Sequence, residues 1–232
     1  MDAPLKNDYA EKKEDYFEQI RSEMLPLLPR SAHRILDIGC GAGAFGSHLR
    51  KHLGREVWGI EPDARAAKKA ASHLDRVLAE PLTNSSALPK NYFDCVFFND
   101  VLEHLVDPWE SLRLVKTSLK QDGIVIASIP NVRHFPTLWR LAFRAEWTYA
   151  ERGILDKTHL RFFTRQTIEN IFHETGYKII SIEGINERAV LGAGDTRLWQ
   201  YYKLLSLIPS KTLTDAKFLQ FAVVAKPVNN TA

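Results

Sequence analysis

Runs of apolar residues alternate along this chain with stretches in which apolar residues recur every three or four positions. The first pattern predicts buried strands, and the second predicts amphipathic helices that pack on a sheet. Residues 93–98 (Phe-Asp-Cys-Val-Phe-Phe) are nearly all apolar, as expected for a parallel strand that is covered on both faces. The alternation of the two patterns therefore predicts an α/β fold.

Turn and cap residues set the expected limits of these elements. Strands are expected over residues 34–38, 56–60, 76–79, 93–98, 123–129, 177–184 and 218–226. Helices are expected over 43–53, closed by Gly54; over 62–71, opened by Pro62; from Asp107 through Leu119, closed by Gly123; and from Thr164 to Gly176. A further charged helix is expected over 5–28, ended by Pro26 and Pro29, so that residues 1–30 form a helical cover.

Two segments interrupt the alternation, at 131–163 and at 186–216. Both follow strand ends, and in open α/β sheets ligands bind outside the carboxyl ends of the strands. We therefore interpret residues 1–232 as a single domain with two substrate-side insertions.

The sharpest local feature is the corner Leu-Asp-Ile-Gly-Cys-Gly-Ala-Gly at 36–43. It predicts a strand, a tight glycine loop and the start of a helix. Gly41, Gly43 and Gly46 fit a dinucleotide fingerprint, and Glu61 ends the next strand, where an acid that binds a ribose belongs. A nicotinamide dehydrogenase is thus one interpretation. Asp37, however, would repel a pyrophosphate and suits a ligand with an ammonium and a sulfonium group.

Four ordered motifs resemble the class I S-adenosylmethionine (SAM)-dependent methyltransferases. They are the glycine corner at 36–43, Val-Trp-Gly-Ile-Glu-Pro at 57–62, Phe-Asp-Cys-Val-Phe-Phe-Asn-Asp-Val-Leu-Glu-His at 93–104, and Gly-Ile-Val-Ile-Ala-Ser-Ile-Pro-Asn at 123–131. The resemblance covers most of residues 30–185 and includes small-molecule enzymes of glycan pathways and ubiquinone-pathway O-methyltransferases. It implies a Rossmann-like, seven-stranded and mostly parallel sheet in the order 3-2-1-4-5-7-6, with an antiparallel seventh strand and helices on both faces.

The resemblance also implies a set of cofactor-binding residues. Glu61 is expected to accept bonds from both ribose hydroxyls of SAM. The loop residues Gly39, Cys40, Gly41 and Gly43 are expected near the methionine part, with Asp37 either ordering the loop or facing the cation. Asn99 is expected at the amino-acid end of SAM, and Glu80 or Leu82 at the adenine.

Methylation of a hydroxyl requires a group that promotes loss of its proton, and histidine suits this role near neutral pH. We expect His159 to be the base or a substrate ligand, oriented by Asp156, with Arg161 binding an anionic part of the acceptor. The alternative is a buried polar network that holds the insertion in place. His104 either lies beside the cofactor with a catalytic role or only packs there.

The first insertion opens with His134 and continues with aromatic and aliphatic residues at helical spacing, including Trp139. His134 and Trp139 are candidate substrate-binding residues. The helix suits a lid over an apolar acceptor, a surface that contacts a membrane or a lipid-linked substrate, or ordinary packing.

Composition narrows the function class. The net charge is +3, from 31 basic and 28 acidic residues spread along 232 positions, so no nucleic-acid partner is expected. Two cysteines and the lack of a signal-peptide pattern predict a cytoplasmic protein. No zinc-like His/Cys spacing is present, so no residue is assigned as a metal ligand and metal dependence stays open. A nucleic-acid or protein methyltransferase and a non-catalytic SAM-binding protein remain the alternatives to a small-molecule methyltransferase.

Overall fold

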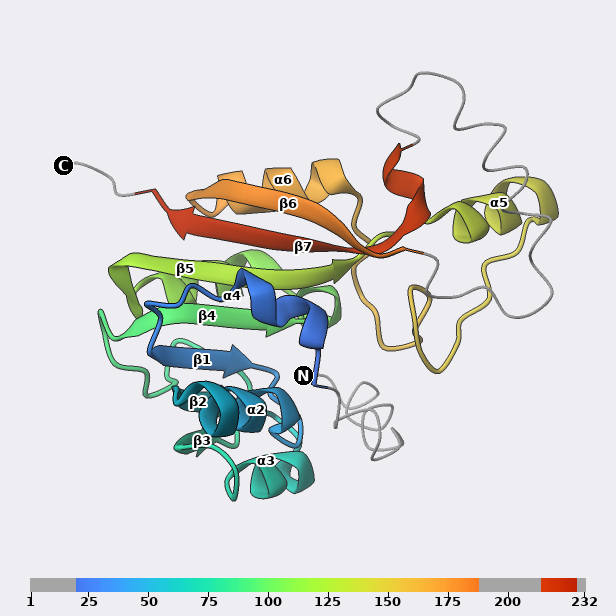
Figure 1. Cartoon of the computed structure of the whole chain (residues 1–232). Helices are drawn as coiled ribbons and strands as arrows, with labels where there is room; N and C mark the ends of the chain where they lie inside the picture. Colours follow the sequence, from blue (N-terminus) through green and yellow to red (C-terminus); the bar gives the residue numbers. More distant parts are fainter. Residues whose placement is uncertain (1–19, 188–213, 229–232) are drawn as a thin grey trace.

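A seven-stranded sheet forms the centre of the chain. In this computed structural model, which describes residues 20–187 and 214–228, the strands are β1 (Arg34–Ile38), β2 (Glu56–Ile60), β3 (Arg76–Leu78), β4 (Phe93–Asn99), β5 (Leu119–Pro130), β6 (Tyr177–Glu187) and β7 (Phe218–Pro227). Their order is β3-β2-β1-β4-β5-β7-β6 (Figure 1). The pairs β1–β2, β1–β4, β2–β3 and β4–β5 are parallel, whereas β7 is antiparallel to β5 and β6. The expected topology is confirmed.

Helices cover both faces of the sheet. The α-helices are α2 (Ala44–Leu53), α3 (Ala64–Ala70), α4 (Pro108–Lys116), α5 (Phe135–Arg144) and α6 (Arg165–Glu174), and the 3-10 turns are η2 (Ser22–Leu27), η3 (Leu102–His104) and η4 (Asp215–Lys217). One core cluster joins the sheet to α4 and α6, and a second joins it to η2, α2 and α3. The helix α5 lies beyond the end of the sheet (Figure 1).

Alternate residues of each central strand enter the two cores. In β1, Leu36 and Ile38 face the α4/α6 side, while Ile35 faces α2. In β4, Phe98 faces the α4/α6 side and Phe97 faces α2. Each fully buried side chain of this size stabilises the fold by about 1.5–3 kcal/mol, and this two-sided burial explains why the strands read as continuous apolar runs.

The N-terminal segment departs from its expected form. Within the described residues the segment before β1 is the short 3-10 turn η2, with Pro26 inside it and Met24 fully buried. The expected α-helix up to residue 28 is wrong there, because Pro26 has no N–H to continue an α-helical ladder. Residues 1–19 of the expected cover lie outside the described residues.

Two helix limits also differ from expectation. Asp63, not Pro62, caps α3, and its Oδ1 accepts hydrogen bonds from the backbone N–H groups of Arg65 and Ala66 at 3.0 and 2.9 Å. The helix α4 ends at Lys116, so Leu119 begins β5 and does not extend the helix.

Gly123 therefore does not close α4 as expected. It lies inside β5, and a Cβ there would come within 3.0 Å of the carbonyl oxygen of Phe93. This glycine permits the close approach of β5 to β4 where their register shifts.

The first insertion, 131–163, is described throughout, and its expected helix is α5. Residues 188–213 of the second insertion lie outside the described residues. Among residues 20–187 and 214–228, no helix has the length and apolar content needed to cross a membrane.

Glycine is found at both ends of α2, at Gly43 and Gly54, for different reasons: both have positive φ, but only Gly43 is also in close contact with another helix. Both have positive φ, +83° and +62°, but a Cβ on Gly43 would lie 3.0 Å from Ala70 Cα, whereas Gly54 faces open space. We expect Gly54→Ala to lower the free energy of unfolding by about 1–2 kcal/mol through backbone strain. Gly43→Ala should add a further loss of about 1–3 kcal/mol from crowding against α3. Urea unfolding measures both, and equal losses would contradict the close contact.

Candidate active site

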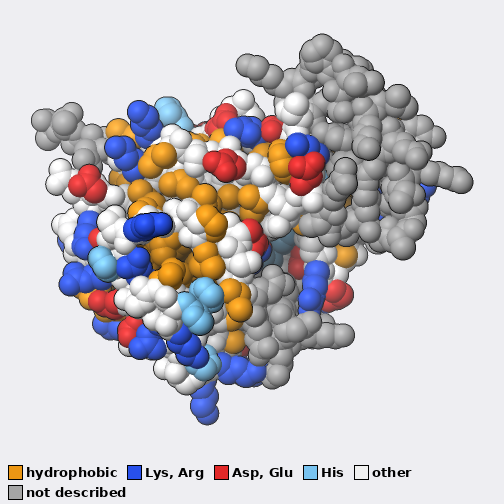
Figure 2. All heavy atoms as spheres, viewed as in Figure 1, with side chains coloured by type: hydrophobic (Ala, Val, Ile, Leu, Met, Phe, Trp, Pro, Cys, Tyr) orange, Lys and Arg blue, Asp and Glu red, His pale blue; other side chains and the backbone are white. Residues whose placement is uncertain are grey.

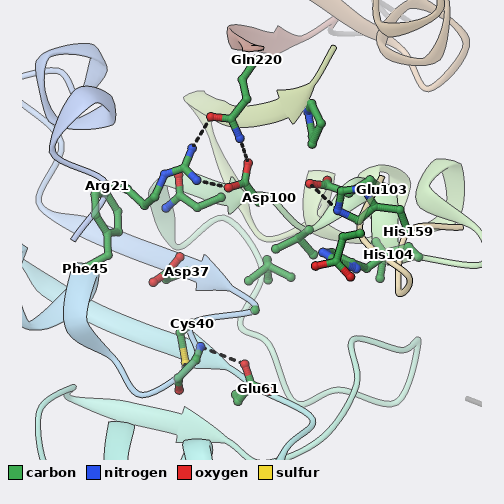
Figure 3. A pocket seen from close by; sticks show the side chains of 18 of the residues that line it. Arg21, Asp37, Cys40, Phe45, Glu61, Asp100, Glu103, His104, His159 and Gln220 are labelled. Carbon is green, nitrogen blue, oxygen red and sulfur yellow. Dashed lines mark hydrogen bonds and ion pairs between the residues drawn. The ribbon is translucent and has the colours of Figure 1, made fainter. Parts of the chain in front are cut away.

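A cavity of about 440 Å³ opens where β1, β2 and β4 end. Figure 3 shows the glycine corner and Glu61 on one side of it and the histidine cluster on the other. The candidate residues that line it are Asp37, Gly39, Cys40, Gly41, Glu61, Asn99, His104, Asp156 and His159. Gly43, His134, Trp139 and Arg161 are not among its lining residues in the described chain.

The glycine corner is fixed to β2 by its backbone. The N–H groups of Gly39 and Cys40 both donate to the carbonyl oxygen of Ile60, at 2.8 and 3.1 Å. Gly39 has φ +67°, and a Cβ there would lie 2.7 Å from Val101 Cγ2. The corner therefore requires glycine at position 39 for both conformation and space.

Glu61 connects the corner to the start of the next loop. Its Oε2 accepts a hydrogen bond from the Gly41 N–H at 2.8 Å, and its Oε1 accepts one from the Asp63 N–H at 2.8 Å. Burial raises the pKa of Glu61, and these two N–H donors oppose that rise. Each carboxylate oxygen keeps a second acceptor position, so Glu61 can hold the loop and still bind a pair of hydroxyls.

Asp37 is almost fully buried at the end of β1. Burial, and then the nearby charge of Glu61, raise the pKa of Asp37 to about 8. A carboxyl group in this position is therefore mostly protonated at neutral pH until a cation enters the cavity. Cys40 stays a thiol, since burial and the two carboxylates raise its pKa well above the ordinary value.

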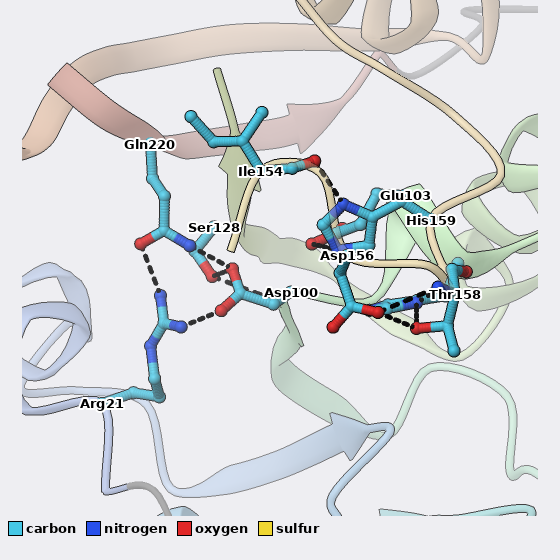
Figure 4. A network of polar contacts seen from close by, with 10 residues as sticks. Arg21, Asp100, Glu103, Ser128, Ile154, Asp156, Thr158, His159 and Gln220 are labelled. Carbon is cyan, nitrogen blue, oxygen red and sulfur yellow. Dashed lines mark hydrogen bonds and ion pairs between the residues drawn. The ribbon is translucent and has the colours of Figure 1, made fainter. Parts of the chain in front are cut away.

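Arg21, Asp100 and Gln220 form a polar network above the cavity that the sequence did not reveal (Figure 4). The Arg21 guanidinium donates to Asp100 Oδ2, and also to Gln220 Oε1 at 3.2 Å. Asp100 Oδ1 accepts from Gln220 Nε2 at 2.7 Å and from Ser128 Oγ at 2.9 Å. Arg21 is one of 31 basic residues in the chain, and nothing in its local sequence distinguishes it.

Backbone geometry brings this network together. Arg21 and Asp100 have φ of 51° and 55°, and Asn186, which donates to Gln220 Oε1 at 2.8 Å, has φ of 56°. Non-glycine residues with positive φ are uncommon and cluster at functional sites.

The histidine cluster lies on the other side of the cavity. The rings of His104 and His159 meet edge to face with centroids 4.6 Å apart, and His159 Nε2 is 4.0 Å from Glu103 Oε1. Glu103 is only 1% exposed, and burial raises its pKa to about 8. Sequence reasoning placed His104 and His159 but missed Glu103, although it directly precedes His104.

The loop that carries His159 is held by its own backbone and by η3. The N–H groups of Leu160 and Arg161 donate to the Glu103 carbonyl oxygen at 2.8 and 3.0 Å. Asp156 Oδ1 accepts from the Thr158 N–H at 2.9 Å and from Thr158 Oγ1 at 2.7 Å. Asp156 thus orders the loop around His159, as in the alternative of a buried polar network.

The three candidate substrate residues outside the cavity have other contacts. His134 precedes α5 and is buried, and burial lowers its pKa to about 4. Trp139 packs between the rings of Phe135 and Phe143. The exposed Arg161 side chain donates to the Val106 carbonyl oxygen at 2.6 Å. Their roles toward a substrate stay predictions.

Residues 9–182 match the family model described as "Methyltransferase domain". The chain belongs to this methyltransferase family. It is 29% identical over 161 residues to the ubiquinone biosynthesis O-methyltransferase of Rhodopseudomonas palustris. This alignment covers 67% of this chain and 62% of that protein. The chain is 33% identical over 102 residues to the enzyme of that name from Bradyrhizobium diazoefficiens, covering 42% of this chain and 40% of that protein.

Solved structures show the same fold. A SAM-dependent methyltransferase from Archaeoglobus fulgidus superposes with a TM-score of 0.62 at 21% identity, over 97% of this chain and all (100%) of that one. The methyltransferase in a complex with the Haloferax volcanii Trm112 activator gives 0.65 at 13% identity, over 97% and 95%. These similarities indicate SAM as the cofactor of this methyltransferase.

The cavity fits this cofactor chemically. Asn99 ends β4, and both polar atoms of its buried side-chain amide lack a hydrogen-bond partner. An amino-acid group carries both donors and acceptors, so it would satisfy them. Arg21 supplies a positive charge for a carboxylate, and Asp37 supplies a negative charge for a cation. Leu82 also lines the cavity, whereas Glu80 is not among the lining residues of the described chain.

Replacing Glu61 should weaken SAM binding. Glu61→Gln retains the size of the side chain but loses the charge and one acceptor, so we expect a loss of about 2–3 kcal/mol, or roughly 30- to 150-fold in affinity. Isothermal calorimetry with SAM measures this loss. Glu174→Gln, on the exposed face of α6, is the matched control and should bind as the unchanged protein does. Equal affinity of both variants would refute the role of Glu61.

SAM binding should release a proton at pH 7. The carboxyl of Asp37, with a pKa of about 8, is mostly protonated before binding, and the cation of SAM favours its ionised form. Affinity should therefore rise as the pH increases towards 8 and then level off. Calorimetry at pH 7 in two buffers of different ionisation enthalpy measures the proton count.

Asp37→Asn provides the comparison for this proton count. This variant has no ionisable group at position 37, so SAM binding should no longer release a proton and the affinity should depend less on pH. Equal proton release by both proteins would show that Asp37 does not change its protonation state when SAM binds.

Proposed function

We propose that this methyltransferase transfers the methyl group of SAM to a hydroxyl oxygen of a small-molecule acceptor. The observation that carries the proposal is the placement of His159 in the same cavity as the glycine corner and Glu61. An acceptor held at the histidine side would face a cofactor held at the glycine side, and alignment of the two reactants is the main requirement of this displacement.

The proposed cofactor contacts follow from the lining residues. Glu61 accepts the ribose hydroxyls, and Asn99 with Arg21 contacts the amino and carboxylate groups of the methionine part. Gly39 and Gly41 allow the backbone to approach the ligand, and Asp37 balances its positive charge. SAM supplies the reactive methyl group, and this chain supplies orientation and protection from water.

The acceptor side requires a path for one proton. The hydroxyl oxygen forms a bond to the methyl carbon as the carbon–sulfur bond breaks, which leaves S-adenosylhomocysteine and the methyl ether. The hydroxyl proton must leave, and His159 promotes this loss. Its Nδ1 lies 2.9 Å from the Ile154 carbonyl oxygen, so Nδ1 carries the hydrogen and Nε2 is the basic nitrogen.

A phenolic or lipid-like acceptor is the first class to test, and a sugar or glycan precursor is the second. The names of the curated relatives support O-methylation, and those relatives act in ubiquinone biosynthesis. Ile154, Leu105 and Leu219 add apolar surface to the cavity lining, which suits an aromatic or aliphatic acceptor.

The other function classes find less support. A base-amine methyltransferase typically carries an Asn/Asp-Pro-Pro-aromatic motif after the fourth strand, whereas this chain has Asn-Asp-Val-Leu at 99–102. Figure 2 shows Lys and Arg side chains dispersed among acidic and apolar ones on the face in view, not gathered in one stripe. A lipid surface at α5, where Phe143 is 70% exposed, stays a prediction.

The role of His159 is tested by His159→Gln. Loss of a group that assists proton removal should lower the turnover number about 100-fold or more, while SAM affinity stays unchanged. The assay follows S-adenosylhomocysteine release with a panel of catechols, phenols and sugars. His173→Gln, on the exposed face of α6, is the matched control. Full methyl transfer by His159→Gln would remove His159 from the reaction.

A further inference from the structure

Three potential metal ligands meet at the acceptor side of the cavity. Glu103, His104 and His159 are all buried, and one ligand atom from each lies within 4.8 Å of the others. Glu103 and His104 come from η3, whereas His159 comes from the first insertion. Two imidazoles and one carboxylate are a common donor set for divalent transition metals.

Hydrogen bonds fix the two histidines in the form that binds metals. His159 Nδ1 lies 2.9 Å from the Ile154 carbonyl oxygen, and His104 Nδ1 lies 3.1 Å from the Thr158 carbonyl oxygen. A carbonyl only accepts, so each Nδ1 carries the hydrogen and each Nε2 keeps its lone pair. Histidines that bind metals usually donate their second ring N–H to such a partner. Figure 4 shows this arrangement at His159.

Glu103 provides an independent observation. Neither of its carboxylate oxygens has a hydrogen-bond partner, and the residue is 1% exposed. Its Oε1 faces His159 Nε2 at 4.0 Å (Figure 3). A buried carboxylate that lacks donors is unfavourable unless a positive charge compensates it.

We propose that Glu103, His104 and His159 bind one divalent transition-metal ion through a carboxylate oxygen and the two Nε2 atoms. Bonds of about 2.0–2.2 Å place such ligand atoms roughly 3–3.5 Å apart, so the side chains must close by about an ångström on binding. Two nitrogen donors favour manganese, iron, cobalt or zinc over magnesium and calcium. The sequence alone indicated no metal ligand here, because His159 is far from Glu103 along the chain.

The proposal rests on the proposed function, and it assigns a binding position to the acceptor hydroxyl at the metal ion. Three protein ligands leave a position open towards the cavity. An acceptor hydroxyl bound there loses its proton to solvent more readily, and the resulting oxygen attacks the methyl carbon as the carbon–sulfur bond breaks. In this arrangement His159 promotes proton loss through the metal and does not itself accept the proton. Acceptors with two adjacent hydroxyls, such as catechols, would bind in preference to simple alcohols.

Cobalt binding tests the site without using activity. Protein without a histidine tag is treated with a chelator and then titrated with CoCl₂, and the visible absorption of bound cobalt is followed. We expect one cobalt per chain. Glu103→Gln and His104→Gln should each weaken binding by 10- to 100-fold or more. His173→Gln should leave it unchanged. Binding of S-adenosylhomocysteine by each variant shows that it is folded.

Two results would overturn the proposal. One is a chelator-treated protein that binds S-adenosylhomocysteine but takes up no cobalt, manganese or zinc. The other is equal metal binding by Glu103→Gln, His104→Gln and the control His173→Gln. The methyl-transfer assay separates this proposal from the proposed function. Methyl transfer to a hydroxyl by metal-free protein would refute the role of the metal and support the proposed O-methyltransferase. Metal binding without methylation of any hydroxyl would support the metal site and refute the proposed O-methyltransferase.

Discussion

Hydrogen bonds between the glycine corner and the end of β2 hold the cofactor side of this enzyme in place. Gly39 and Cys40 donate to the Ile60 carbonyl oxygen, and Gly41 donates to the Glu61 carboxylate. Adjacent parallel strands bring these groups to one edge of the sheet. The same carboxylate that shapes the loop is therefore available to bind the ligand, so loop geometry and cofactor recognition depend on one side chain.

Buried carboxyl groups then give the cavity its electrostatic character. Asp37 and Glu61 line one side and Glu103 lines the other, and burial raises the pKa of each. Such groups disfavour a pyrophosphate and favour cationic ligands. A positively charged sulfonium at one end and a metal ion at the other would each relieve part of this cost, which makes the two proposed occupants electrostatically compatible.

The sheet and the cofactor corner could be predicted from the sequence because their signals are local. A buried strand reads as an apolar run, and the glycines and acids of the corner lie close together in the sequence. The Arg21–Asp100–Gln220 network and the Glu103–His159 contact could not be predicted in this way, because each joins residues from distant parts of the chain. The predicted start of α3 was wrong because two neighbouring residues can each begin a helix, and Asp63 caps α3 where Pro62 was expected to open it.

The strand order has a consequence for assembly of the site during synthesis. β7 follows the other described strands in the sequence, yet it lies between β5 and β6, and among the described strands β6 pairs only with β7. It also carries Gln220, which contacts both Arg21 and Asp100. A nascent chain that has emerged only as far as β6 consequently lacks both the strand that pairs with β6 and the Gln220 side of the cavity. Completion of the sheet and of the cavity therefore requires β7 to be available for pairing, which makes the last step of assembly a long-range one.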